Sequence, residues 1–216
     1  MQKKKAFWFF DFISPYAYIQ SKRLEYLQSF LDIELIPVLF AGLLNHFGQL
    51  GPAEIKFKRQ HTFRQCLFIT NQKGIKFKLP AHHPFNPLFP LRTSILKGNS
   101  FEVVTKIFDF IWTTGKNIDD PDAQKYLLDQ LEISDITLLS NDNIKQKLKE
   151  NTSLAIQKGI FGVPSFYVDN EIFWGQDSED LLVYYLENSQ KTKLTYFNPV
   201  DQFPESKINR RKKIGE

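Results

Sequence analysis

The N-terminal forty residues show a strand pattern, a helix pattern and a second strand pattern. Residues 6–12 form a short, nearly continuous apolar run rich in aromatic side chains, which predicts a strand buried on both faces of a sheet. Ser14 and Pro15 follow as an N-cap and a first helical residue. Apolar residues at positions 17, 24, 27 and 31 then lie on one helical face, so we expect a helix that runs to about Leu31. Residues 33–39 predict a second strand.

The middle of the chain, from about Ala41 to Glu150, has apolar residues at helical spacing, interrupted by loop-forming residues, and shows no strand pattern. A proline-rich, irregular connection occupies residues 80–90. Apolar periodicity predicts helices over residues 52–69, 87–97, 101–113, 121–131 and 141–156.

Strand character returns near the C-terminal end. Residues 164–168 and 171–174 are apolar runs joined by Asp169-Asn170, which predicts a hairpin, and residues 180–187 predict a helix. The order is therefore β-α-β, a helical block, and β-β-α. We predict an α/β protein with a thioredoxin-like fold and a large all-helical insertion domain. Residues 1–40 and 157–189 would form the thioredoxin-like domain, 41–156 the insertion and 190–216 a C-terminal tail.

The charge pattern gives little indication of a macromolecular partner. The formal net charge is +4, and most of the excess lies at the ends of the chain, in Lys3–Lys5 and Arg210–Lys213. No nucleic-acid motif accompanies these basic ends, so we expect solvated termini and no nucleic-acid partner. No segment approaches the roughly 18 apolar residues of a membrane span, and we predict a cytoplasmic protein without a membrane partner. The 21 phenylalanines indicate either aromatic-lined pockets or a genomic bias in composition.

The single cysteine, Cys66, excludes an internal disulfide, a CxxC redox centre and a cysteine zinc cluster. Apolar residues follow it, so we predict a buried side chain rather than a nucleophile. The adjacent His82 and His83 lack a spaced cluster of further ligands, and we predict no metal site.

Three segments carry candidate chemistry: residues 11–17, 159–165 and 173–177. The first places Ser14 where a strand ends into a helix, and a helix N-terminus stabilises an anion such as a thiolate. From the local sequence alone, Ser14 is either an ordinary cap or an anion-binding group, and the ordinary cap is favoured. In the second segment, Pro164 follows a glycine-bearing loop, where a cis peptide bond is an alternative to the commoner trans form.

Taken together, and over about residues 6–189, these segments resemble the 2-hydroxychromene-2-carboxylate isomerases and the kappa-class glutathione transferases, in the DsbA-like branch of the thioredoxin superfamily. The resemblance is carried by Asp-Phe-Ile-Ser-Pro-Tyr, Gly-Val-Pro-Ser-Phe and Trp-Gly-Gln-Asp, in that order. Redox members of that branch have Cys-Pro-x-Cys where this chain has Ser14-Pro15-Tyr16-Ala17. The resemblance therefore implies glutathione as the source of sulfur instead of disulfide exchange.

The resemblance also implies roles for single residues. Ser14 matches the catalytic serine, which hydrogen-bonds the glutathione sulfur and favours its thiolate. Val163 matches the residue whose backbone pairs with the cysteinyl unit, and Pro164 matches the cis-proline. Asp177 matches the acidic residue near the γ-glutamyl amine, where Ser178 would assist.

Two positions depart from the family pattern, and four more are candidate substrate contacts. Gln49 stands where an asparagine is expected in the loop after the second strand, although Asn45 is close, and Ser178 stands where relatives commonly have arginine. Glutathione affinity or pose would differ accordingly. The candidate substrate contacts are Pro15, Tyr16, Asn86 and Arg92, with Arg92 alternatively holding the two domains together.

The implied activity is a glutathione-dependent isomerisation of an aromatic, pyruvate-like substrate by reversible addition of the thiolate. A kappa-like transferase that conjugates glutathione to electrophiles is the alternative. A binding module for glutathione or peptides, without chemistry of its own, is a further one. Relatives are commonly dimers, so a homodimer is expected.

Overall fold

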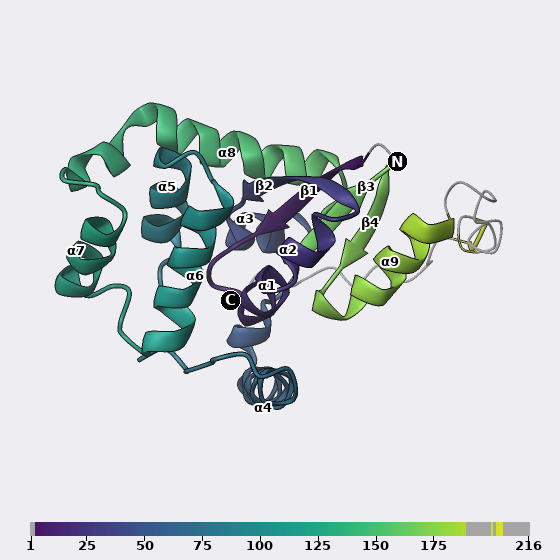
Figure 1. Cartoon of the computed structure of the whole chain (residues 1–216), viewed down its shortest axis with the longest axis horizontal. Coiled ribbons are helices and arrows are strands. Elements are labelled where there is room, and N and C mark those ends of the chain that lie inside the picture. The colour runs from purple at the N-terminus through teal and green to yellow at the C-terminus, as the bar shows by residue number, and fades with distance from the viewer. Residues whose placement is uncertain (1–2, 189–199, 201, 205–216) are drawn as a thin grey trace, which may run out of the picture.

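The computed structural model describes residues 3–188, 200 and 202–204. Its centre is a four-stranded mixed sheet in the order β2-β1-β3-β4 (Figure 1). β1 (Lys4–Phe10) pairs in parallel with β2 (Leu31–Pro37) and antiparallel with β3 (Ser165–Val168). β4 (Glu171–Trp174) pairs antiparallel with β3. The predicted α/β thioredoxin-like fold is confirmed.

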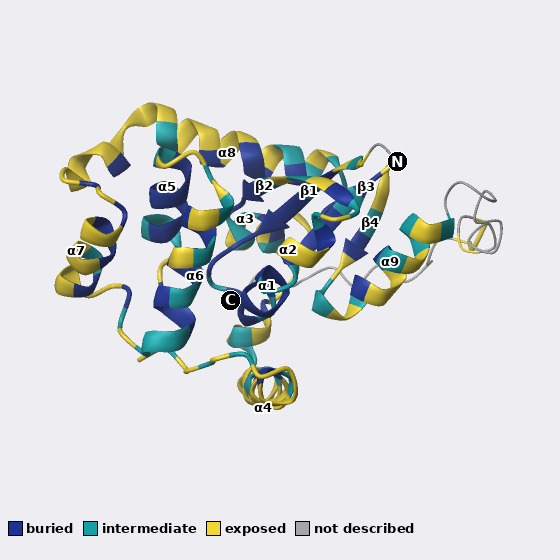
Figure 2. Ribbon diagram, viewed as in Figure 1, coloured by how far each residue is buried: buried dark blue, intermediate teal, exposed yellow. Residues whose placement is uncertain are grey.

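The central strand β1 is buried on both faces, as its continuous apolar pattern predicted. Trp8, Phe9 and Phe10 are all 0% exposed, and alternate residues point to opposite sides of the sheet. Trp8 and Phe10 belong to one apolar cluster with Phe108, whereas Phe9 belongs to a second cluster. The sheet therefore has a core on each side, which Figure 2 shows as buried strands between exposed outer faces.

The first helix is shorter than predicted. α1 spans Pro15–Ser21, and α2 spans Leu24–Leu27. Between them the N–H groups of Lys22 and Arg23 bond to carbonyls three residues back, which ends the first helix in a tight turn. The prediction of one helix to Leu31 was wrong, because Leu31 already begins β2 opposite Lys4.

Every element described between β2 and β3 is a helix, and the five predicted helices are present with shifted ends. The prediction of one helix from residue 52 to 69 was wrong in detail, because Ile55 is extended and separates η1 from α4. The elements are α3 (Phe40–His46), η1 (Pro52–Glu54), α4 (Lys56–Gln72), α5 (Leu88–Leu96), α6 (Phe101–Thr114), α7 (Pro121–Gln130), η2 (Ile136–Ser140) and α8 (Asp142–Gln157).

The C-terminal hairpin follows its sequence pattern closely. Asp169 and Asn170 both have positive φ angles, 52° and 70°, as a two-residue turn between antiparallel strands requires. η3 (Gln176–Ser178) and α9 (Glu179–Asn188) follow β4. The predicted tail, 190–216, lies outside the described residues except for 200 and 202–204.

The helices cover the sheet unequally. α3 and α8 contact each other, α8 contacts β2, and residues of both belong to the second apolar cluster (Figure 1). Both helices lie almost entirely in the predicted insertion, residues 41–156, yet they pack on the sheet. The division of the chain into a thioredoxin-like domain and an insertion domain stays a prediction. α4 stands at the periphery, and only Cys66 and Thr70 of its residues are buried (Figure 2). Of the helices described, none is long and apolar enough to cross a bilayer.

Candidate functional site

Ser14 caps the first helix and faces a distant loop. Its backbone is extended, and its hydroxyl oxygen accepts a hydrogen bond from the Ala17 N–H at 3.2 Å. The same hydroxyl donates to the carbonyl oxygen of Val163 at 3.4 Å. Ser14 is 8% exposed. The predicted cap is confirmed, and it lies against the second segment that the sequence singled out.

The loop before Ser14 is held at almost every backbone group. The Asp11 carboxylate accepts from the Ile13 N–H at 3.1 Å, and the indole N–H of Trp112 donates to the Phe12 carbonyl at 3.0 Å. Nε2 of His83 lies 2.9 Å from the Ile13 carbonyl oxygen, so this nitrogen carries the proton. Because its backbone groups are already paired, the loop presents Ser14 in one fixed position.

Asp11 was not singled out as a site residue, although it opens the first motif. It is completely buried, and its second carboxylate oxygen accepts from the Phe40 N–H at 2.9 Å, where α3 begins. Burial raises the pKa of Asp11 to about 7, although hydrogen bonds from the backbone N–H groups of Phe40, Ile13 and Phe12 act in the opposite direction. The sequence signal that could have identified Asp11 is its position directly after a buried strand.

The Val163–Pro164 peptide bond is cis. The Pro164 carbonyl accepts from the Gly175 N–H at 2.9 Å, which ties this loop to the third segment. A side chain on Gly162 would collide with the indole Nε1 of Trp174, so the glycine allows the ring to pack against the loop. The Val163 N–H has no hydrogen-bond partner among the described residues.

Asp177 lies beside the first turn of α1. Gly175 has a φ of 91°, and a side chain there would collide with the Asp177 carboxylate. Burial raises the pKa of Tyr16 to about 12, with smaller contributions of the same sign from Cys66 and Asp177. The η3 segment that carries Asp177 contacts α1. The buried Gln20 donates to the Gly175 carbonyl at 3.1 Å. The structure therefore brings the three predicted segments together.

The other predicted contacts are placed differently. Gln49 is exposed, and no hydrogen bond of its side chain occurs within the described part of the chain. The Asn86 side chain accepts from the Leu88 N–H and so caps α5, while buried Nε of Arg92 has no described partner. Ser178 turns its hydroxyl back to the Gly175 carbonyl at 2.9 Å. None of these contacts joins the residues to Ser14.

Tyr16 and Pro15 lie on the first turn of α1. Pro15 is buried, and the Tyr16 hydroxyl donates to Gln65 of α4 at 2.7 Å. The predicted burial of Cys66 is confirmed, since its side chain is 0% exposed. Burial raises the pKa of the Cys66 thiol to about 12, which keeps it protonated at neutral pH.

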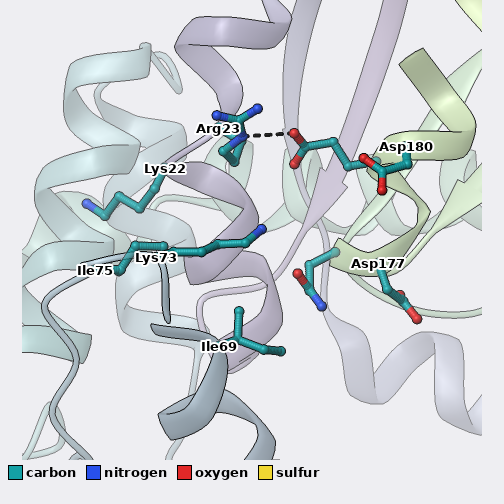
Figure 3. A pocket seen from close by; sticks show the side chains of 9 residues that line it. Lys22, Arg23, Ile69, Lys73, Ile75, Asp177 and Asp180 are labelled. Carbon is teal, nitrogen blue, oxygen red and sulfur yellow. Dashed lines mark hydrogen bonds and ion pairs between the residues drawn. The ribbon is translucent and has the colours of Figure 1, made fainter. Parts of the chain in front are cut away.

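A cavity of about 720 Å³ lies along α1 from Asp177. Its walls come from the end of α1, the end of α4 and the start of α9 (Figure 3). Charged side chains of both signs line it, among them Lys22, Arg23, Lys73, Asp177 and Asp180. Within the described residues, no group of three His, Cys, Asp or Glu side chains is arranged to hold a metal ion.

Residues 7–187 match the sequence model of the DSBA-like thioredoxin domain. The chain belongs to the DSBA-like thioredoxin family. This DSBA-like protein is 28% identical over 183 residues to glutathione S-transferase kappa 2 of Caenorhabditis elegans. The aligned region covers 77% of this chain and 81% of that relative. It is 24% identical over 177 residues to the 2-hydroxychromene-2-carboxylate isomerase of Pseudomonas putida, and this alignment covers 78% of this chain and 87% of the isomerase.

Solved structures agree on the fold. The DSBA-like protein superimposes on a 2-hydroxychromene-2-carboxylate isomerase with a TM-score of 0.76 at 21% identity, covering 93% of this chain and all of the other. The cytosolic disulfide reductase DsbM of Pseudomonas aeruginosa, solved with GSH, gives a TM-score of 0.57 at 14% identity. The superposition covers 91% of this chain and 99% of the reductase. The predicted resemblance is confirmed, and the curated relatives are named as enzymes.

Proposed function

We propose that the protein is a glutathione-dependent isomerase of the 2-hydroxychromene-2-carboxylate isomerase type. One observation carries the proposal: the Ser14 hydroxyl lies at the N-terminus of α1 and 3.4 Å from the Val163 carbonyl of the cis-proline loop. A sulfur anion placed there meets a hydroxyl donor and the positive end of a helix. Ala17 occupies the second cysteine position of redox relatives, so disulfide exchange is not available.

The free N–H of Val163 supports the peptide part of this proposal. A cysteinyl carbonyl of glutathione would accept from this N–H, while the sulfur lies at Ser14. Asp177 would bind the γ-glutamyl amine, with Ser178 beside it. In this pose, glutathione crosses all three segments that the hydrogen bonds hold together.

The chemistry is covalent catalysis by a borrowed nucleophile. The thiolate adds to an electrophilic carbon of an aryl pyruvate-like substrate and converts a double bond into a single bond. Rotation follows, and the electrons return as the thiolate leaves, so glutathione is not consumed. Ser14 and the helix N-terminus stabilise the sulfur anion before the addition and again as it departs, and the fixed loop orients it.

The remaining assignments extend this proposal to the substrate. We place Pro15, Tyr16, Asn86 and Arg92 as candidate substrate contacts and Gln49 as a further candidate for glutathione. A cytoplasmic location and a homodimeric state likewise stay predictions.

Conjugation is the second candidate function, and the kappa 2 transferase from Caenorhabditis elegans, 28% identical, favours it. The same site would then release the adduct instead of expelling the thiolate. A module that binds glutathione or a peptide without chemistry is the third candidate.

Glutathione consumption tests the first two. The protein is incubated with glutathione and either 2-hydroxychromene-2-carboxylate or a chloronitrobenzene. We expect the hydroxychromene to isomerise with no loss of free thiol. Thiol loss in proportion to chloronitrobenzene consumed, without isomerisation of the hydroxychromene, would replace the proposal with conjugation.

Ser14→Ala separates an enzyme from a binding module. Removing one oxyanion-type donor typically costs about 10²–10³ in turnover, and we expect a loss of that order with glutathione still bound. Unchanged turnover in Ser14→Ala would remove the serine from the mechanism. Binding of glutathione by the wild type without turnover of either substrate would support the non-catalytic module.

A further inference from the structure

The charged cavity beside Asp177 has an unusual balance of paired and unpaired groups. Arg23 forms an ion pair with Glu179, N to O 2.8 Å, and Lys22 forms one with Asp109. Lys73, Asp177 and Asp180 also line the cavity, and no ion pair or hydrogen bond of their side chains occurs in the described part of the chain. One cation and two carboxylates that line the cavity therefore have no side-chain partner among the described residues.

These unpaired groups come from opposite walls. Lys73 follows the last residue of α4 and extends its amine into the cavity, toward the side on which Asp177 lies (Figure 3). Asp177 and Asp180 belong to η3 and to the first turn of α9. Ile69 and Ile75 add an apolar surface beside Lys73. The cavity therefore offers a positive group beside apolar side chains on one wall and negative groups on the other.

A free amino-acid head group has the complementary arrangement, since it carries an α-carboxylate and an α-ammonium on one carbon. Charge-assisted hydrogen bonds to both groups fix its orientation as well as its affinity. The γ-glutamyl end of glutathione is such a head group on a short apolar stem. Ser178, next to Asp177, is uncharged, and its hydroxyl donates to the Gly175 carbonyl at 2.9 Å.

We infer that Lys73 binds the α-carboxylate of the γ-glutamyl residue, across the cavity from Asp177 at the α-ammonium. The inference rests on the proposed use of glutathione and adds a binding residue from the helical region. It makes the end of α4 part of the glutathione site, so that two separate parts of the fold contact the tripeptide.

Binding of two ligands by matched variants tests the assignment. Glutathione and cysteinylglycine, which lacks the γ-glutamyl residue, are titrated calorimetrically into wild type, Lys73→Gln, Lys73→Arg and Lys76→Gln. Lys76 is exposed, lies three residues beyond Lys73 and does not line the cavity, so Lys76→Gln removes the same charge outside the proposed site. Circular dichroism checks that each variant is folded.

We expect Lys73→Gln to weaken glutathione binding about fivefold to tenfold, as for loss of a partly exposed charged hydrogen bond. Its binding of cysteinylglycine should stay unchanged, and Lys73→Arg and Lys76→Gln should bind glutathione within about twofold of the wild type.

Wild-type affinity of Lys73→Gln for glutathione would overturn the assignment of Lys73 and leave the proposed function standing. An equal loss for both ligands would also overturn it, because the γ-glutamyl residue would not be the group that Lys73 contacts. If the wild type binds neither ligand, the proposed use of glutathione fails together with this inference.

Discussion

The hydroxyl of Ser14 lies 3.4 Å from the carbonyl oxygen of Val163, although 149 positions separate them in the chain. The sheet brings them together, since β1 and β3 are antiparallel neighbours and Phe9 lies opposite Ser165. The end of one central strand therefore meets the beginning of the other. A helix N-terminus and a cis-proline loop become one site because of this pairing.

Two substitutions of Ser14 separate its capping role from its proposed catalytic role. Ser14→Ala leaves the Ala17 N–H without its side-chain acceptor, and we expect about 1 kcal/mol less unfolding free energy. Ser14→Gly also loses the hydroxyl, but glycine at an N-cap costs only a few tenths of a kcal/mol relative to serine. Urea denaturation measures the stability difference.

Both Ser14 variants should lose turnover to the same extent, because both lack the donor to sulfur. Turnover that instead follows stability, with Ser14→Gly close to wild type, would assign the serine to the helix cap alone.

Gly162 is expected to tolerate alanine poorly, because the new methyl group would overlap Trp174 Nε1. The indole is 53% exposed and packs edge-on against Phe161, so it must shift and disturb the Val163–Pro164 loop. We expect a loss of about 1–2 kcal/mol in unfolding free energy and altered tryptophan fluorescence.

A double variant, Gly162→Ala with Trp174→Leu, provides the control for this clash. In the Trp174→Leu background, Gly162→Ala should cost much less unfolding free energy than it costs in the wild type. A loss that is the same in both backgrounds would show that the methyl group is opposed by something other than the indole.

The sequence allowed most of the fold to be predicted, where local pattern and burial agree. The continuous apolar run of residues 6–12 matched a strand buried on both faces, and Asp169-Asn170 matched a hairpin turn. The apolar stripe through Leu24, Leu27 and Leu31 misled, because all three residues are buried while a turn and a strand interrupt the helix. Periodicity records burial, and burial alone does not keep a helix continuous.

The site was predictable only where motifs mark it. Motifs name Ser14, Val163 and Asp177 as candidates, whereas no local pattern indicates that His83 bonds the Ile13 carbonyl or that Lys73 lines the neighbouring cavity. α3 was missed for a similar reason. Its first N–H is bonded by the Asp11 carboxylate, 29 positions earlier, so the signal that begins this helix lies outside its own segment.

Gln20 is expected to set the position of the Gly175–Asp177 segment. Its side chain is 1% exposed, accepts from the Trp8 indole N–H at 2.7 Å and donates to the Gly175 carbonyl at 3.1 Å. Gln20→Met removes both bonds and leaves the buried indole N–H without a partner, at a cost of about 1–3 kcal/mol. Thermal unfolding measures this cost.

Gln20→Glu is the matched comparison, since its carboxylate still accepts from Trp8 but no longer donates to Gly175. If Gln20 positions Asp177, both variants raise KM for glutathione more than they change kcat. A fall in kcat alone would indicate that the segment is positioned without Gln20.

The stability contribution of Asp11 should decrease as pH rises. Burial raises its pKa from 3.8 to about 7 in the folded protein, so between these values the folded state holds a proton that the unfolded state has released. The linked free energy is of the order of 4 kcal/mol, fully present below about pH 4 and lost as pH approaches 7. Asp11→Asn should abolish this slope in urea titrations at a series of pH values.

Asp129→Asn makes the same chemical change on an exposed carboxylate and should leave the slope of the wild type. If Asp11→Asn also leaves it, the Asp11 carboxyl is ionised in the folded protein throughout this range.

His83 should change the free energy of unfolding with pH in the opposite direction to Asp11. Burial is the main cause of its lowered pKa, with smaller contributions of the same sign from Arg59 and His82. Below about pH 6.5 the unfolded state therefore binds a proton that the folded state does not accept, and stability falls as pH falls. Because the Asp11 effect spans about pH 4 to 7 and the His83 effect begins below about pH 6.5, the two effects overlap near pH 6, and single variants are needed to separate them.

His83→Gln should therefore remove the His83-linked loss of stability below pH 6.5 and leave the opposing slope of Asp11. His61→Gln, an exposed histidine on α4, is the control and should retain the wild-type profile. Since His83 also fixes the carbonyl next to Ser14, its variant should lower turnover at every pH, whereas a purely electrostatic role would lower it only where the imidazole titrates. Measuring unfolding free energy and turnover over the same pH series distinguishes a positioning role of His83 from a purely electrostatic one.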